Sequence, residues 1–132
     1  MSTRGIYTFK AFGETFHVYK HSDNYPTGAQ IALAAVMEQG KAWDLPRFEA
    51  DEFAAGFVAA NKDGGGNVRL AKSRTSACDV AYGYTVAQIK GKKDVQLTVT
   101  SIDFWDGKAK ETKLWAGRLV DFTPEVAAKL EE

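Results

Sequence analysis

The chain has 132 residues, of which 17 are basic and 17 acidic, so its formal net charge is zero, and this argues against an acidic protein that imitates DNA. A hydrophobic fraction of 45% excludes a disordered chain, and a length of this order suits a single domain with one core. Cys78 is the only cysteine, which excludes an internal disulfide and fits a reducing compartment.

Two strands are predicted at the N-terminal end. Residues 4–10 and 14–21 are rich in β-branched and aromatic residues that alternate between two faces, and Gly13 marks the turn between them. The two segments therefore predict a hairpin. The second strand is expected to carry three side chains together on its polar face: His17, Tyr19 and His21.

Two helices are predicted after the hairpin. Pro26 ends the extended segment, and Thr27 with Gln30 forms a capping-box pattern for a helix that runs to about Gln39. Residues 47–61 have apolar side chains at helical spacing, with acidic residues near the start, where the helix dipole favours them.

The rest of the chain predicts a β-meander and a final helix. The alternating segments are 67–72, 80–89, 95–100 and 112–119, and Thr123 with Pro124 starts a short C-terminal helix. Tight hairpin connections favour antiparallel pairing. We therefore expect the α+β class: an antiparallel sheet, formed by the N-terminal hairpin and the C-terminal meander, with two central helices packed on one face.

The segment from His17 to Pro26 concentrates the residues that can carry chemistry. In one hypothesis Asp23 orients His21 as a general acid or base, and Arg4 stabilises an anionic group, as in a small hydrolase or a metal-dependent enzyme. Histidines four apart on a strand lie about 13 Å from each other, too far to share one metal ion. We therefore expect neither a bound metal nor another cofactor.

A second hypothesis treats the same segment as a binding surface. Ser22, Asp23 and Asn24 are typical turn residues, because their side chains bond nearby backbone groups. Aromatic and histidine side chains on an open sheet face give a large contact area at a small entropic cost. The residues expected on this surface are His17, Tyr19, Lys20, His21 and Tyr25.

A third hypothesis comes from the uneven distribution of charge. Residues 65–120 contain ten basic and five acidic side chains, so a basic face could contact nucleic acid or an acidic protein surface. Solvated lysines at strand edges explain such a bias more often. The candidates for a nucleic-acid stripe are Arg69, Lys72, Arg74, Lys90, Lys92 and Lys93, with Lys108 and Lys110 beyond them.

Three short segments resemble a set found in small uncharacterised phage and prophage proteins: Thr3-Arg4-Gly5, Val18-Tyr19-Lys20-His21 and Asp23-Asn24-Tyr25-Pro26. Those proteins begin with Met, a small residue and Thr-Arg, and they carry a Tyr-x-His-x-Asp-Gly-Tyr turn before a helix. The resemblance covers mainly residues 3–33, with a looser similarity over 45–70. This chain departs from the pattern with Asn24 in place of the usual glycine and with Ser22 in place of an aromatic residue.

The resemblance implies a viral or mobile-element setting, in which small stable domains bind host macromolecules. We therefore expect a binding protein rather than an enzyme, located in the cytoplasm of an infected bacterial host. Inhibition of a bacterial defence system, as anti-CRISPR proteins do, is one such role. The partner is expected to be a host or phage protein, with nucleic acid as the alternative, and we expect no membrane contact because the longest apolar segment is far too short.

Overall fold

The computed structural model describes residues 3–77, 79–88, 94–105 and 107–132. Across these residues the elements follow one another as β1 (Gly5–Ala11), β2 (Glu14–Lys20), α1 (Pro26–Glu38), α2 (Ala50–Asn61), β3 (Val68–Ala71), β4 (Tyr82–Gln88), β5 (Val95–Trp105), β6 (Lys108–Arg118), the 3-10 turn η1 (Leu119–Asp121) and α3 (Pro124–Lys129). The strands form one mostly antiparallel sheet, and the predicted α+β class is confirmed.

The strands lie in the order β3-β2-β1-β4-β5-β6. The N-terminal hairpin is confirmed by the antiparallel pairing of β1 with β2, and the meander is confirmed over β4, β5 and β6. The expectation that residues 67–72 open the meander was wrong: β3 pairs with β2, and β4 pairs with β1 in parallel. The reason is that the connection after β3 crosses the sheet and places β4 beside β1, instead of turning back as a hairpin.

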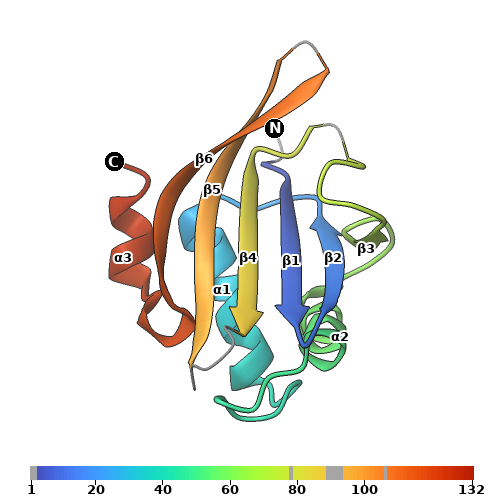
Figure 1. The fold of residues 1–132 in the computed structure, drawn as a ribbon, viewed down its shortest axis with the longest axis vertical. Helices are drawn as coiled ribbons and strands as arrows, with labels where there is room; N and C mark the ends of the chain where they lie inside the picture. The colour runs from blue at the N-terminus through green and yellow to red at the C-terminus, as the bar shows by residue number, and fades with distance from the viewer. Residues whose placement is uncertain (1–2, 78, 89–93, 106) are drawn as a thin grey trace.

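The main core lies between the sheet and the helices, which cover its rear face in Figure 1. Tyr7 of β1 contacts Phe57 of α2 and Tyr84 of β4, with ring centroids 4.4 and 5.0 Å apart. Phe9 contacts both Phe53 and Phe57. These aromatic side chains alternate along their strands with residues on the opposite face, so the spacing in the sequence determined which side chains enter this core.

The opposite face of the sheet is partly covered. A second apolar cluster contains Ile6, Tyr19, Val80 and Ile102, with Ala77 packed against it. Val80 and Ala77 belong to the connection between β3 and β4, which crosses this face of the sheet. The face that carries His17, Tyr19 and His21 is therefore less open than the sequence suggests.

The helix ends follow the sequence signals in part. Thr123 Oγ1 accepts a hydrogen bond of 3.3 Å from the Val126 amide, which confirms the predicted start of the C-terminal helix. The capping box at Thr27 was wrong, because α1 already begins at Pro26 and Tyr25 occupies the cap position without a side-chain bond. Helix α2 begins at Ala50, three residues later than expected. No helix within the described ranges combines the length and the apolar composition needed to cross a lipid bilayer.

The turn between β1 and β2 has an unusual residue. Phe12 and Gly13 both have positive φ, 53° and 80°, as a two-residue turn of type I′ requires. Glycine adopts this conformation freely, whereas the Cβ atom of phenylalanine disfavours it. Phe12 is 80% exposed, so its ring gains little burial that could offset the strain in the backbone.

Candidate binding site

Asn24 is the structural centre of the segment that the sequence singled out. Its side chain is fully buried, and its Nδ2 group donates hydrogen bonds of 2.8 to 3.0 Å to the carbonyl oxygens of Lys20, Ser22 and Thr3. The turn before α1 is therefore fixed to the start of β1 from inside. The left-handed residue of this turn is Asp23, with φ of 62°.

Two tyrosines complete the bonding of Asn24. The Tyr7 hydroxyl donates to Asn24 Oδ1 at 2.7 Å, and the Tyr84 hydroxyl donates to the Asn24 carbonyl oxygen at 2.6 Å. Burial raises the pKa of Tyr7 well above its ordinary value, and burial also raises the pKa of Tyr84. Both hydroxyls therefore remain protonated donors, and their role here is structural.

The proposed catalytic group is only partly assembled. Arg4 and His21 line one hollow, but Asp23 is not among its lining residues. The carboxylate that forms an ion pair with Arg4 belongs to Asp79. His21 Nδ1 lies 2.9 Å from the Tyr19 hydroxyl, so a tyrosine and not an aspartate orients the imidazole.

The expected exposed binding face must also be corrected. Tyr19 is only 5% exposed and Lys20 only 8%. Lys20 Nζ donates to the Ser22 carbonyl oxygen at 2.5 Å, and burial lowers the pKa of Lys20, although the charge of Asp23 opposes this shift. His17 and His21 are half-buried, and Tyr25 is partly exposed. The connection after β3 and the packing of the turn cause these differences.

A basic hollow of about 480 Å³ lies beside β3. We use the name basic hollow for the space lined by Arg4, Tyr19, His21, Arg69, Leu70, Ala71, Lys72, Ser76, Ala77 and Asp79. Three of these residues are cationic, and Asp79 is the only carboxylate among them. The Arg69 guanidinium lies 4.7 Å above the centre of the Tyr19 ring, a cation–π contact that holds this charge at the wall of the hollow.

Arg4 is paired within the wall of the basic hollow. Its guanidinium pairs with Asp79, yet Nε is buried and has no hydrogen-bond partner within the described part of the chain. Because Nε is buried, a ligand in the hollow cannot reach it, whereas Arg69 and Lys72 are exposed cations of the same lining. The hollow therefore favours an anionic ligand, and carboxylates match the fork of a guanidinium well.

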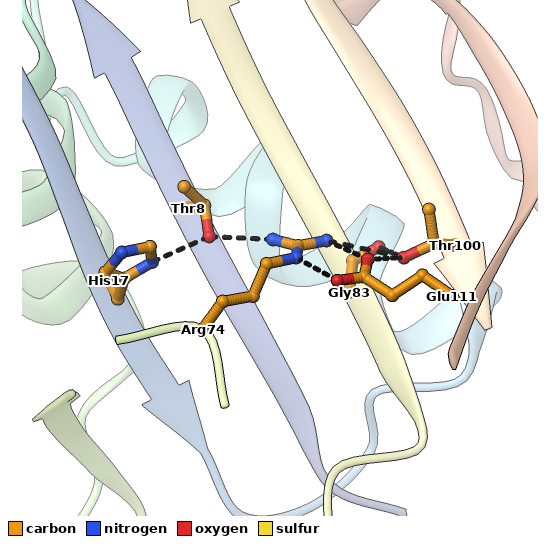
Figure 2. Close-up of polar contacts among 6 residues, drawn as sticks. All are labelled: Thr8, His17, Arg74, Gly83, Thr100 and Glu111. Carbon is orange, nitrogen blue, oxygen red and sulfur yellow. Dashed lines mark hydrogen bonds and ion pairs between the residues drawn. The ribbon is translucent and has the colours of Figure 1, made fainter. Parts of the chain in front are cut away.

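A polar network crosses the same face of the sheet. Figure 2 shows Arg74, from the connection after β3, lying over the strands between Thr8 and Glu111. Its Nη1 donates to Thr8 Oγ1 at 2.7 Å, and its Nε and Nη2 donate to the two carboxylate oxygens of Glu111 at 2.8 and 2.9 Å. Beyond these bonds the network reaches His17 Nδ1, the Thr100 hydroxyl and the Gly83 carbonyl oxygen.

The polar network shifts the pKa values of Glu111 and His17. The hydrogen bonds from Arg74 hold the pKa of Glu111 below its ordinary value, although burial opposes this effect. Burial lowers the pKa of His17, and the charges of Arg74 and Lys10 lower it further. A Cβ atom at Gly83 would lie 2.3 Å from Arg74 Nη2, so the absence of a side chain there makes room for the guanidinium.

These positions correct the nucleic-acid hypothesis. Arg74 is engaged with Glu111 and cannot serve as a free phosphate ligand. Arg69 and Lys72 lie at the β3 edge, whereas Lys108 and Lys110 lie on β6 at the other edge of the sheet. The candidates Lys90, Lys92 and Lys93 lie outside the described residues. The described members therefore do not form one stripe.

Sequence reasoning missed several residues of both sites. Asp79, Thr8 and Glu111 are single polar residues without a motif, and their contacts join segments far apart in the sequence, such as Thr8 and Arg74, which are 66 residues apart. Among the described residues, no three histidine, cysteine or acidic side chains are grouped so that they could hold a metal ion. Comparisons with protein-family models, with curated proteins and with solved structures found no match for this chain.

Proposed function

We propose that this chain is a small binding protein that engages a host macromolecule through the basic hollow, and that the partner presents carboxylates. The observation that carries the proposal is the hollow itself, where Arg4, Arg69 and Lys72 face a single carboxylate. Charge of one sign on the wall of a hollow attracts oppositely charged groups and accelerates their association.

Arg69 is a cation of the hollow that a partner can reach. Its residue is exposed, and the Tyr19 ring below it limits the freedom of the guanidinium. A guanidinium that is already positioned loses less entropy when it binds a carboxylate. Lys72, at the end of β3, adds a second charge on the same wall.

Binding is favoured over catalysis by the partners of His21 and Ser76. His21 bonds to the Tyr19 hydroxyl and not to a carboxylate. The Ser76 hydroxyl donates to the Ser73 carbonyl oxygen at 3.0 Å, so it is part of a turn and not activated by a base. Among the described residues of the lining, the one serine is thus not paired with a base, and the hollow contains charge for recognition.

The setting implied by the resemblance gives this binding a biological role. In a phage or another mobile element, a small protein of this kind would act in the host cytoplasm. Inhibition of a defence nuclease or of its regulatory subunit would be such an action, as with anti-CRISPR proteins. The mixed charge of the chain favours a shaped contact with a protein over imitation of DNA.

The test compares two double charge reversals. Arg69→Glu with Lys72→Glu changes the basic hollow, and Lys108→Glu with Lys110→Glu changes the other edge of the sheet by the same charge. Each immobilised variant is incubated with bacterial host lysate, and the retained proteins are quantified by mass spectrometry. We expect the wild-type protein and the Lys108→Glu, Lys110→Glu variant to retain the same partner. The Arg69→Glu, Lys72→Glu variant should lose it.

A nuclease-treated lysate distinguishes the two classes of partner. Retention after the treatment identifies a protein partner. Loss of all binding after the treatment would instead favour nucleic acid, whose affinity would also fall steeply with salt. Equal retention by the two double variants would contradict the proposal, because the basic hollow would then contribute nothing specific.

A further inference from the structure

The short strand β3 lies at one edge of the sheet, and its pairing with β2 determines which of its backbone N–H and C=O groups point outward. The His21 amide donates to the Asn67 carbonyl oxygen at 2.8 Å, and Tyr19 faces Arg69 in the same antiparallel register. Bonded positions alternate along such a pair. The backbone groups of Asn67 and Arg69 therefore point toward β2, and those of Val68 and Leu70 point away from the sheet.

A second contact supports the outward direction of the Val68 backbone groups. Lys62 Nζ donates to the Val68 carbonyl oxygen at 2.9 Å, from the outer side of the strand. The lysine thus covers one end of the edge, as charged side chains often do at exposed strands. At Leu70 the outward N–H and C=O groups belong to a residue that is 82% exposed.

The two sides of β3 differ in character. The basic hollow lies on one side. A second cavity of about 370 Å³, which we call the apolar hollow, lies beside α2 and is lined mainly by apolar side chains, among them Phe16, Ala54, Val58 and Leu70. Leu70, Ala71 and Lys72 line both hollows, and the apolar hollow also contacts His17 and Asp51. The strand therefore lies between a hollow with three cations and a hollow whose lining is mostly apolar.

We propose that β3 accepts an extended segment of the partner protein as an added strand, and that this segment alternates acidic and apolar residues. Successive side chains of a strand point to opposite faces, so the acidic ones would enter the basic hollow and the apolar ones the apolar hollow. Backbone bonds to Leu70 would supply the register. This inference rests on the proposed function, because it names the chemistry and the geometry of the same partner.

The charge of the edge selects this occupant over a second copy of the chain. Two β3 strands paired with each other would bring Arg69 and Lys72 of both copies together, and like charges across a strand pair are destabilising. An acidic segment instead neutralises these side chains. Because β3 spans only Val68–Ala71, the bound segment needs to be only about as long as a short strand.

The test uses two labelled synthetic peptides of identical composition. In the first, Glu alternates with Ile and Val over seven residues, and in the second the same residues are grouped into an acidic and an apolar block. Binding is measured by fluorescence anisotropy at physiological salt. We expect the alternating peptide to bind at least about tenfold more tightly, because only it places each side chain on its matching side.

Two substitutions at one position isolate the backbone contribution. Leu70→Pro and Leu70→Ala both remove the leucine side chain, but only proline removes the outward N–H group. An edge strand tolerates proline at this position because that N–H group does not bond to β2. We expect Leu70→Pro to bind the alternating peptide up to about tenfold more weakly than Leu70→Ala. Slower hydrogen exchange of the Leu70 amide in the wild-type complex is a measurement that does not depend on the folding of the proline variant.

The outcomes separate the inference from the function on which it rests. Strand addition is overturned if both peptides bind equally, if the proline and alanine variants behave alike and if the Leu70 amide is not protected. Loss of partner binding in the Arg69→Glu, Lys72→Glu variant would still support the basic hollow. If neither peptide binds, the inference is overturned as well. A dimer that Leu70→Pro converts to a monomer would identify a second copy as the occupant, and this too would overturn it.

Discussion

The hydroxyl of Tyr7 donates a hydrogen bond of 2.7 Å to Asn24 Oδ1, in a place where both side chains are fully buried. This bond joins the first strand to the turn that precedes α1. A Cβ atom at Gly5 would lie 2.6 Å from Asn24 Cβ, so the amide and the strand are in close contact. The segments Thr3-Arg4-Gly5 and Asp23-Asn24-Tyr25-Pro26 therefore meet in one structural unit.

Asn24→Ala should reduce the free energy of unfolding by about 2 to 4 kcal/mol, because the Tyr7 hydroxyl and three backbone carbonyl groups lose their partner. Asn67→Ala is the matched control, since that amide forms one long bond of 3.3 Å to the Asn61 carbonyl oxygen. Urea denaturation of both variants measures the difference. Equal losses in the two variants would show that Asn24 does not hold the turn.

Gly83→Ala should also destabilise the protein, by about 1 to 2 kcal/mol, because its Cβ atom must displace the Arg74 guanidinium. The same substitution should cost much less when Arg74 has already been replaced by alanine. A double-mutant cycle from thermal or urea unfolding gives this coupling free energy. Simple additivity of the two substitutions would contradict the close contact between them.

The stability of the protein should decrease when the pH falls below about 6.5, the ordinary pKa of histidine. The pKa of His17 is lowered in the folded state, mainly by burial, so the unfolded chain binds the proton first and the free energy of unfolding falls until the pH has passed the folded pKa. Above the ordinary pKa, His17 contributes no pH dependence. Urea unfolding of the wild-type protein and of His17→Asn at several pH values should show this slope only in the wild type.

Glu111 provides a control in a different pH range. Its pKa is lowered by the bonds from Arg74, so its contribution is complete above the ordinary pKa of a glutamate and is lost as the pH falls through the lower folded value. Glu111→Gln should therefore alter the stability profile in this more acidic range. A slope near pH 6 that persists in His17→Asn would contradict the assignment to His17.

Phe12→Asn should stabilise the protein by about 1 kcal/mol, because asparagine tolerates positive φ and Asn-Gly suits a type I′ turn. Phe12→Ala is the control: it removes the exposed ring but leaves a Cβ atom in the same strained conformation. Thermal unfolding should show a higher midpoint for the asparagine variant only. An equal rise in both variants would mean that the exposed ring, and not the backbone, is unfavourable.

The sequence by itself determined the local structure and the faces of the strands. Alternation placed Tyr7 and Phe9 on the side that became the main core, and Thr123 with Pro124 determined the start of α3. These features depend on neighbouring residues, whose spacing and backbone preferences are present in the sequence.

Only the tertiary structure decided which strands became neighbours. Alternation states which face a side chain occupies, but not which strand lies beside it. The pairing of β3 with β2 and of β4 with β1 depends on chain segments far apart in sequence. These pairings send the connection after β3 across the sheet. The connection there covers Tyr19 and brings Arg74 to Glu111, 37 residues away. The basic hollow and the free edge of β3 both result from that crossing, because they form where this connection meets the edge of the sheet.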